Sequence, residues 1–508
     1  MRDGFSRTMT LPAFSRLLAA GWTLIRADAL IPRELDGVLP GGVRTLARGL
    51  RLLAGRQARQ GRPGERLARS LEGLGPVAIK LGQVLSTRAD IFGSVFATDL
   101  ARLKDALPPF PLDQAKAEVE RELGKPLAEI FPVFGEAVGA ASLAQAHRAT
   151  LADGREVAVK ILRPGIERRV AQDSATLLMA GELIEALFPL ARRLEPVAFA
   201  QTVIRSLQLE LDMRFEAAGA AELAEVMARD SWMRAPTVVW DGVAKRVLTL
   251  EWAGGLPLSD PATLDAPGLD RKAVADNLIR AFLAQALDHG VFHADLHEGN
   301  LFVVPPTGIV AVDFGIVGRL APETRRYLAE ILYGFLTRDY PRVAKAHFDA
   351  GYVPAHHDAD AFAQALRAIG EPVFGRAASE LSMSRLLALL FEITALFDMR
   401  LRPELVLLQK TMVTVEGVAR RLWPDHDLWA AADPVVRRWI ARELSPAARV
   451  RDFADDAVRA LRAIASMAEA GAAPTVVVEP APETSGMAWL AAGAAIAGAA
   501  FLLARLLG

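Results

Sequence analysis

The chain has 508 residues, 52% of them hydrophobic, and its formal net charge at pH 7 is −1. This length provides enough chain for two or three domains' worth of core. Because no net basic charge favours nucleic acid, we expect no nucleic-acid partner. The chain has no cysteine, which excludes disulfides, thiolate metal sites and a cysteine nucleophile.

The N-terminal 125 residues have a helical pattern. We expect no cleaved signal peptide, because Arg16, Arg26 and Asp28 interrupt the apolar positions at the start of the chain. One or two amphipathic helices are predicted there, packed on the protein's own core or on a membrane surface. Further along, Gly82 falls in the middle of a predicted helix, where it costs about 1 kcal/mol relative to Ala. This position therefore indicates close approach of another group to that helix.

The period of the pattern changes near residue 132. Residues 133–164 predict three strands joined by tight turns, and residues 167–230 predict helices. A strand within 247–255 leads into a glycine-rich hinge, and an amphipathic helix over 270–290 ends at Gly290. Residues 322–470 are helical again. The order predicts an antiparallel sheet followed by a helical part, without internal repeats.

Four polar residues in chain order carry the strongest chemical signal. Lys160 ends the strand sequence VAVK, Asp295 and Asn300 lie in HADLHEGN (293–300), and Asp313 opens DFG. The layout H-x-D-x-x-x-x-N followed by D-F-G is that of protein kinases. There the Lys contacts the α and β phosphates, the first Asp takes the acceptor proton, and Asn and the second Asp bind Mg²⁺.

Three features depart from an ordinary protein kinase. Ala294 replaces the usual Arg, and no G-x-G-x-x-G loop lies upstream. Only residues 316–320 separate DFG from Ala321-Pro322-Glu323, which leaves no room for a segment that docks peptides. We therefore expect ATPase activity or phosphorylation of a small molecule or lipid-linked acceptor. His293 is interpreted as a structural support of the loop, and His297 as a polar loop residue.

The C-terminal segment predicts a membrane-spanning tail. Residues 487–504 contain no charge, and at roughly 1.5 Å per residue a helix of this length approaches the ~30 Å hydrocarbon core. The preceding residues 471–486 have the composition of a linker. Because the nucleotide is cytoplasmic, the main part of the protein is expected to face the cytoplasm.

Several stretches together resemble the UbiB family of atypical kinases, which are required for ubiquinone biosynthesis. They are KLGQ at 80–83, GAASLAQAH at 139–147, ELDMRFEA at 210–217, HADLHEGN and VDFGIVGR. The resemblance extends from about residue 15 to the tail. Two departures are Leu296 and Glu298, where family members often have Pro, and a single predicted span where bacterial members often have two.

The resemblance implies roles for further residues. An alanine-rich loop replaces the glycine-rich loop, and its Cβ atoms are expected to restrain phosphoryl transfer. Glu216 would pair with Lys160, whereas Lys80 would enter the site and pair with Glu210 and Asp212. The helix that carries Lys80, Gly82 and Gln83 would cover the place where a kinase binds peptide. These three residues, with Glu210 and Asp212, are therefore expected to be regulatory. The nucleotide-contacting residues implied are Val138, Gly139, Ala140, Ala141, Ser142, Leu143, Ala144, Gln145, Ala146, Lys160 and Glu216, and the catalytic residues are Asp295, Lys160 and Lys80.

The predicted fold is therefore α+β: a protein-kinase-like, two-lobed fold with added N-terminal and C-terminal helices and a C-terminal transmembrane helix. The expected parts are a helical extension (1–125), an N-lobe (126–255), a helical C-lobe (256–470), a linker (471–486) and a membrane tail (487–508).

The leading hypothesis is a kinase or ATPase of the bacterial inner membrane that uses ATP and Mg²⁺ to support ubiquinone biosynthesis. The expected partners are membrane lipids, prenylated quinone precursors and the biosynthetic enzymes, and a homodimer is compatible with the tail. Two alternatives stay open. One is a small-molecule phosphotransferase of the aminoglycoside or choline kinase type, and the other is a lipid-binding pseudokinase scaffold.

Overall fold

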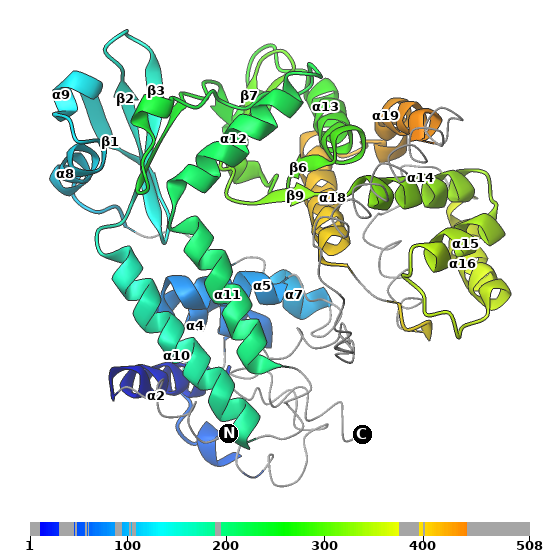
Figure 1. Cartoon of the computed structure of the whole chain (residues 1–508), viewed down its shortest axis with the longest axis horizontal. Coiled ribbons are helices and arrows are strands. Elements are labelled where there is room, and N and C mark those ends of the chain that lie inside the picture. The colour runs from blue at the N-terminus through cyan, green and yellow to red at the C-terminus, as the bar shows by residue number, and fades with distance from the viewer. Residues whose placement is uncertain are drawn as a thin grey trace, which may run out of the picture. The chain divides into compact units, whose positions relative to one another are not determined.

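The computed structural model describes residues 11–29, 48–55, 60–86, 94–100, 108–187, 195–374, 396–399 and 402–443, and the single residues 45, 58 and 103. These residues belong to two compact units (Figure 1). Unit 1 takes the described residues up to 221 together with 236–253, and unit 2 takes 222–235 and the described residues from 254 to 443. Each unit is described by itself.

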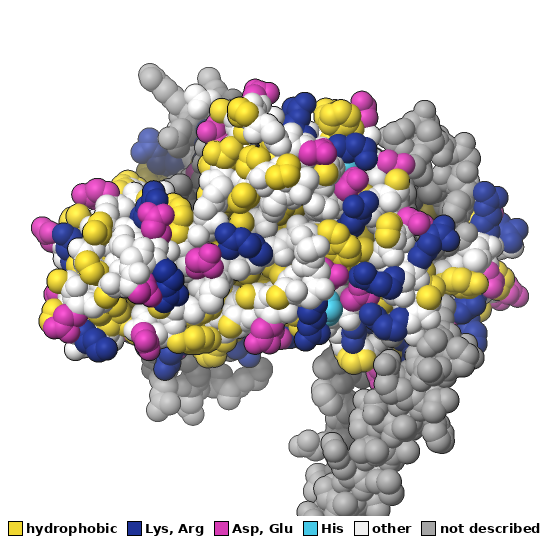
Figure 2. Space-filling view, turned by 90° about the horizontal axis from the view of Figure 1, so that it is seen from above, with side chains coloured by type: hydrophobic (Ala, Val, Ile, Leu, Met, Phe, Trp, Pro, Cys, Tyr) yellow, Lys and Arg dark blue, Asp and Glu magenta, His cyan; other side chains and the backbone are white. Residues whose placement is uncertain are grey.

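The surface carries both signs of charge. On the face drawn in Figure 2, acidic and basic side chains are interspersed instead of forming separate fields. This distribution matches the formal net charge of −1.

An antiparallel sheet forms the core of unit 1. Its strands pair in the order β1-β2-β3-β4. They are β1 (Val133–Ala140), β2 (Ala144–Thr150), β3 (Glu156–Leu162) and β4 (Val247–Glu251). In β3 the alternate residues Val157, Val159 and Ile161 are buried, as expected for a strand with one face on the core. The three strands predicted within 133–164 and the strand predicted at 247 are confirmed.

Helices make up the rest of unit 1. They are α2 (Leu11–Arg26), α4 (Pro63–Leu74), α5 (Pro76–Ser86), α7 (Ser94–Leu100), α8 (Leu112–Leu123), α9 (Leu127–Ile130), α10 (Ile166–Leu187), α11 (Pro196–Glu210) and α12 (Met213–Met227), of which α12 continues into unit 2. Helices α8 and α9 cover the sheet, whose core includes Val119 and Phe131. Helices α4, α5 and α7 pack together, and α10 and α11 lie side by side (Figure 1).

The structure explains the glycine inside α5. A Cβ at Gly82 would lie 2.2 Å from Leu103 Cδ1 and 2.8 Å from Leu71 Cδ1. Both distances are well inside van der Waals contact, so these leucines occupy the space that a side chain would need. The close approach indicated by the sequence is therefore the packing of α4 and of Leu103 against this turn of α5.

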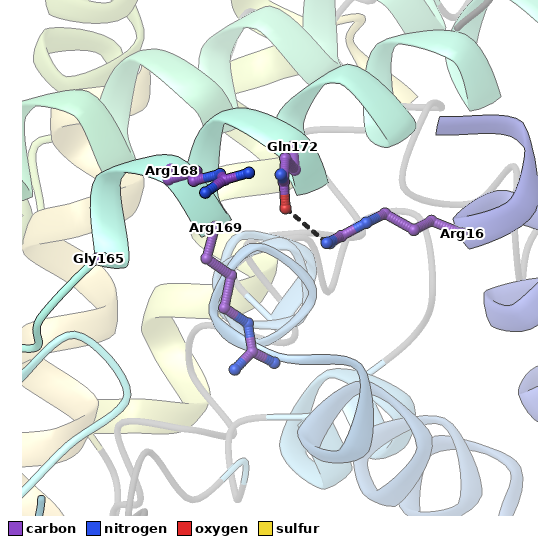
Figure 3. A pocket seen from close by; sticks show the side chains of 5 residues that line it. All are labelled: Arg16, Gly165, Arg168, Arg169 and Gln172. Atoms are coloured by element: carbon purple, nitrogen blue, oxygen red, sulfur yellow. Dashed lines mark hydrogen bonds between the residues drawn. The ribbon is translucent and has the colours of Figure 1, made fainter. Parts of the chain in front are cut away.

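Helix α2 packs against α10 through polar contacts at a shallow hollow (Figure 3). Arg16 donates to Gln172 Oε1 at 2.5 Å and to Asp173 Oδ1 at 2.5 Å. Arg169 lies 3.7 Å from the same carboxylate, and Arg168 also lines the hollow. Because Asp173 offsets part of this positive charge, we assign the hollow no ligand.

Unit 2 contains two small antiparallel sheets and a set of helices. One sheet has the order β5-β7-β8, and β6 pairs with β9. The strands are β5 (Leu256–Pro257), β6 (Val291–His293), β7 (Leu301–Val304), β8 (Gly308–Ala311) and β9 (Val317–Arg319). The helices are α13 (Arg271–Leu283), α14 (Pro322–Leu336), α15 (Tyr340–Asp349), α16 (Ala359–Phe374), α18 (Pro403–Leu422) and α19 (Leu428–Glu443).

The helix predicted over 270–290 has two parts. Asp270 caps α13 by accepting from the Ala273 backbone N–H at 3.0 Å, and the chain then continues as a π-helix over Ala284–His289. Gly290 ends it with φ +73°, a left-handed conformation that glycine adopts without strain. The predicted end is confirmed, but the π-helical turn was not predicted.

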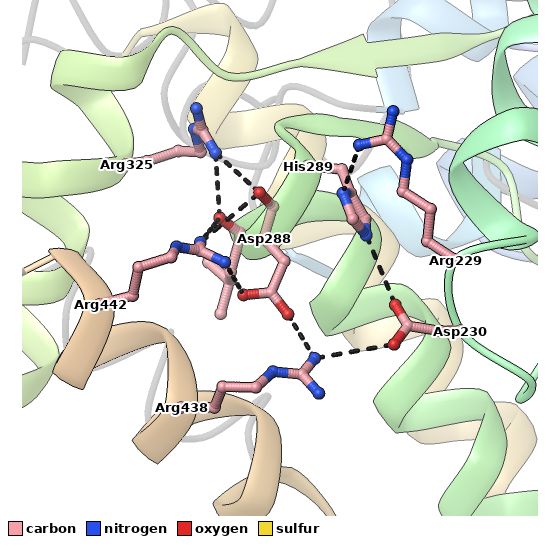
Figure 4. Close-up of polar contacts among 8 residues, drawn as sticks. Arg229, Asp230, Asp288, His289, Arg325, Arg438 and Arg442 are labelled. Carbon is pink, nitrogen blue, oxygen red and sulfur yellow. Dashed lines mark hydrogen bonds and ion pairs between the residues drawn. The ribbon is translucent and has the colours of Figure 1, made fainter.

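The π-helix is tied to α19 by a buried carboxylate (Figure 4). Asp288 lies 2.5 Å from Arg438 and 2.8 Å from Arg442. Arg325 donates to the Leu287 and Asp288 carbonyls at 3.3 Å and 3.0 Å. One acidic side chain and two carbonyls thus receive guanidinium groups from α14 and α19.

Among the described residues, none of the helices combines the length and apolar character needed to cross a membrane. The predicted span at 487–504 and the linker at 471–486 lie outside the described residues.

Asp288→Ala should lower the free energy of unfolding by about 2 kcal/mol, because it leaves two arginines without their shared partner. Asp433→Ala is the matched control. It removes an exposed pair with Arg437 within one helix, worth less than about 0.5 kcal/mol. Denaturant titration followed by tryptophan fluorescence measures both. Equal losses in the two variants would contradict an anchoring role for Asp288.

Candidate functional site

The predicted site residues fall in both units. Unit 2 holds Asp295, Asn300 and Asp313 in the loops that follow β6 and β8, and unit 1 holds Lys80, the alanine-rich loop, Lys160 and Glu216. The two groups are described separately.

His293 connects the two loops of unit 2. Its Nδ1 accepts from the Asp295 backbone N–H at 3.1 Å, so Nε2 carries the proton and donates to the Val312 carbonyl at 3.1 Å. The side chain is fully buried and its ring lies 5.3 Å from that of Phe314. Burial lowers the pKa of His293, which favours the neutral imidazole that this pair of bonds requires. The structural role predicted for His293 matches these contacts.

Asn300 lies between the same loops. Its side-chain N–H donates to the Asp295 carbonyl at 3.1 Å, and its own carbonyl accepts from Val312 N–H at 2.9 Å. Asp313 follows directly with φ +63°, and its Oδ1 accepts from Gly315 N–H at 3.3 Å. Asn300 thus brings the Asp295 loop against the residue before Asp313. The Asn300 amide oxygen and the Asp313 carboxylate are oxygen donors of the kind that Mg²⁺ takes.

The carboxylate of Asp295 has two basic neighbours. His297 Nε2 lies 3.6 Å from Oδ2, and Lys410 Nζ on α18 lies 3.9 Å from Oδ1. The next residue on α18, Thr411, donates to the Ala294 carbonyl at 3.1 Å, which fixes this helix to the loop. The sequence did not indicate Lys410, because a lone lysine far along the chain carries no motif.

In unit 1 Lys160 and Glu216 form an ion pair. Lys160 Nζ on β3 lies 2.7 Å and 3.0 Å from the two carboxylate oxygens of Glu216, in the first turn of α12. Both side chains are partly buried. The contact that the resemblance implied is present.

The alanine-rich loop is a short hairpin between β1 and β2. Ala141 N–H donates to the Ala144 carbonyl at 2.8 Å, and Arg163 donates to the Ala141 carbonyl at 2.8 Å. Ser142 is buried. Gln145 is also buried and exchanges hydrogen bonds with the Phe110 backbone at 2.8 Å and 3.2 Å. This side chain therefore supports the fold and is not free to contact a nucleotide.

The KLGQ helix makes one of the two contacts expected of it. Lys80 is buried and pairs with Glu210 at the end of α11. Asp212 instead accepts from Arg214 at 2.6 Å and 2.8 Å, and this guanidinium lowers the pKa of the Asp212 carboxyl. The expectation that Asp212 pairs with Lys80 is wrong, because Asp212 pairs with Arg214, two residues further along the chain.

The residues that follow DFG form a strand and then a helix. Residues Val317–Arg319 form β9 against β6, and α14 starts at Pro322 with Glu323 in its first turn. A Cβ at Gly318 would lie within 2.6 Å of three ring carbons of Phe292, so only glycine fits there. Ala321-Pro322-Glu323 is thus the start of a helix.

Comparison with known proteins defines the class. Residues 102–347 match the model of the ABC1 atypical kinase-like domain, and residues 366–427 match that of the UbiB helical domain. The solved complex of Rv3197 with erythromycin from Mycobacterium tuberculosis shares the fold, with a TM-score of 0.51 and 23% identity over 72% of this chain and 90% of that one. The protein is therefore an atypical kinase with a kinase-like α+β fold.

Curated relatives narrow the class to a family. A probable protein kinase UbiB of Pseudomonas paraeruginosa is 39% identical over 454 residues, covering 88% of this chain and 85% of the relative. One of Marinobacter nauticus is 38% identical over 395 residues, covering 77% and 72%. The chain belongs to the UbiB family.

Lys410→Met should lower phosphotransferase turnover roughly tenfold, because the carboxylate of Asp295 loses a cation that holds its position. Lys410→Arg should retain most of the activity. The matched control is Lys345→Met, which removes an exposed lysine paired with Asp349 elsewhere in unit 2. Steady-state kinetics of the purified full chain decide the matter, and unchanged turnover in Lys410→Met would contradict the role.

Proposed function

We propose that this protein binds ATP with Mg²⁺ and supports ubiquinone biosynthesis by hydrolysing ATP or phosphorylating a small or lipid-linked acceptor. The ion pair of Lys160 and Glu216 carries the proposal. Its 2.7 Å contact between a strand lysine and a helix carboxylate is the arrangement in which kinases hold the lysine that binds phosphates. The family's description as atypical kinases supports it further.

Each chemical role falls to a group with suitable surroundings. Asn300 and Asp313 offer the oxygen ligands for Mg²⁺, which would offset charge on the transferring phosphate. Asp295, with Lys410 and His297 beside it, is the group that would take a proton from the acceptor. Lys160 would neutralise the α and β phosphates.

Two features argue against an ordinary protein acceptor. The chain after Asp313 becomes β9 and α14 at once, so it offers no docking segment for a peptide. The alanine-rich loop presents Cβ atoms where a kinase has glycines, and these keep phosphates away from the loop N–H groups. A water molecule or a small acceptor needs neither feature.

The name of the relatives, UbiB, supports the proposed pathway. We place the protein at the bacterial inner membrane through its uncharged segment at 487–504, with the nucleotide-binding part in the cytoplasm. Its partners there would be membrane lipids, prenylated quinone precursors and the enzymes that modify them, and it would act on the precursors or on the enzyme complex.

The first test is the ubiquinone content of cells that lack the chromosomal copy. Wild type should restore it, whereas Asp313→Asn should not, because the amide removes a charged Mg²⁺ ligand. In vitro, the same change should lower Mg²⁺-dependent ATP hydrolysis on the order of a hundredfold. Asp433→Asn, on the surface of α19, is the matched control.

Other outcomes identify the alternatives. Equal rescue by wild type and Asp313→Asn would keep the pathway but favour a lipid-binding pseudokinase scaffold. A deletion strain with normal ubiquinone would overturn the pathway and favour a small-molecule phosphotransferase.

Ala141→Gly should raise the affinity for ATP several-fold, because the loop N–H groups can then approach the phosphates more closely. Isothermal titration calorimetry measures it. Gly139→Ala is the matched control, because it adds a Cβ to the same stretch of chain instead of removing one. A Cβ at Gly139 meets nothing within 4 Å, so the variant should fold normally and gain no affinity. A gain in both variants, or in neither, would argue against the steric account.

A further inference from the structure

Two histidines and an aspartate of unit 2 converge outside the kinase motifs. His356 and His357 lie in the loop between α15 and α16, and Asp398 lies in the segment 396–399 that precedes α18. One ligand atom from each of the three residues falls within 4.8 Å of the others. None of the three residues belongs to a motif of the sequence.

The separations match those between the ligands of one metal ion. Nε2 of His357 lies 3.2 Å from Asp398 Oδ2, and Nε2 of His356 lies 3.9 Å from the same oxygen. Ligands at about 2.0–2.1 Å from a tetrahedral Zn²⁺ stand about 3.4 Å apart. The distance from each imidazole nitrogen to the carboxylate oxygen is therefore within about half an ångström of the spacing that a shared ion needs.

The neighbouring core fixes part of this arrangement. His357 is mostly buried and its ring lies 5.4 Å from that of Phe397, in a T-shaped contact. Phe397 belongs to the hydrophobic core of α15 and α16, where it contacts Phe362 at 4.9 Å. Asp398 follows this anchor directly. One imidazole is thus positioned by packing, and the backbone of Asp398 is fixed next to it, as a metal site requires.

An ordinary surface ion pair explains the cluster poorly. The side chains of His356 and Asp398 are 68% and 70% exposed. An ion pair as exposed to water as this one contributes little to the stability of the fold. The imidazole rings lie only 4.2 Å apart, so two imidazolium ions would repel each other. A divalent cation would be bound by both imidazoles and the carboxylate at once, and it would replace the hydrogen bond that now joins His357 to Asp398.

The ligand chemistry selects the metal. Two imidazole nitrogens and one carboxylate favour Zn²⁺ or a similar borderline ion, whereas Mg²⁺ prefers oxygen ligands alone. Three protein ligands leave one position for water. We propose that His356, His357 and Asp398 form a Zn²⁺ site, separate from the oxygen ligands Asn300 and Asp313.

Such a site would join two parts of unit 2 that are distant in the sequence. It would link the loop after α15 to the segment that leads into α18. Helix α18 carries Lys410 and Thr411, which contact the Asp295 loop. Zinc binding should therefore stabilise the folded chain at the end of the helix that supports this loop.

The test uses the full chain purified without a histidine tag and freed of metal with EDTA. Titration with Zn²⁺ in the presence of excess Mg²⁺, followed by calorimetry, should show one ion bound per chain. His356→Ala, His357→Ala and Asp398→Asn should each weaken this binding at least about tenfold. Co²⁺ at the same site should give the visible absorption of a tetrahedral ion in wild type only.

Asp349→Asn is the matched control, because it removes an exposed carboxylate at the end of α15 and should leave zinc affinity unchanged. Melting temperatures in EDTA, equal in all variants, establish that each is folded. The proposal is overturned if wild type binds no Zn²⁺. It is also overturned if the three variants bind it as tightly as wild type, or if Mg²⁺ displaces it.

Discussion

The loops of unit 2 depend on the neutral state of one buried imidazole. His293 accepts from the Asp295 backbone through Nδ1 and donates to Val312 through Nε2, so one ring sets the spacing of two loops. A second proton, on Nδ1, would set that N–H against the Asp295 backbone N–H, and both groups are donors. Burial opposes that proton, and the contact is thereby kept at neutral pH. Asn300 repeats the connection through its side chain and backbone. The positions of Asp295, Asn300 and Asp313 thus follow from hydrogen bonds that no substrate needs to supply.

Unit 1 relies on charge pairs instead. Lys160 on β3 pairs with Glu216 on α12, and Lys80 on α5 pairs with Glu210 on α11. Removing charges from water is costly, so each lysine needs its partner in place. Asp212 pairs with Arg214, and the carboxylate that pairs with Lys80 is that of Glu210. Among the described residues of unit 1, Lys80 thus pairs with Glu210 and Lys160 with Glu216.

Local patterns predicted the elements well and the long-range contacts poorly. Alternating apolar residues marked β3, and Gly290 marked the end of its helix, because strand period and left-handed backbone are properties of a few adjacent residues. Gly82 signalled a close approach, but its neighbours Leu71 and Leu103 could only come from the fold. The π-helix at Ala284–His289 has no sequence period of its own. Lys410 reaches Asp295 only because α18 packs on its loop, which a motif search does not detect.

The strand that follows DFG has a consequence for control of the enzyme. Residues 316–321, Ile-Val-Gly-Arg-Leu-Ala, contain no hydroxyl group, and Arg319 is held by Glu222 at 2.5 Å. In many kinases this stretch is a movable segment that a phosphate switches on. Here it has no acceptor for a phosphate, and it cannot leave β6 without uncovering Phe292. Any adjustment of activity must therefore enter through other parts of the molecule, and the enzyme should not exist in separate phosphorylated-on and unphosphorylated-off forms governed from this strand.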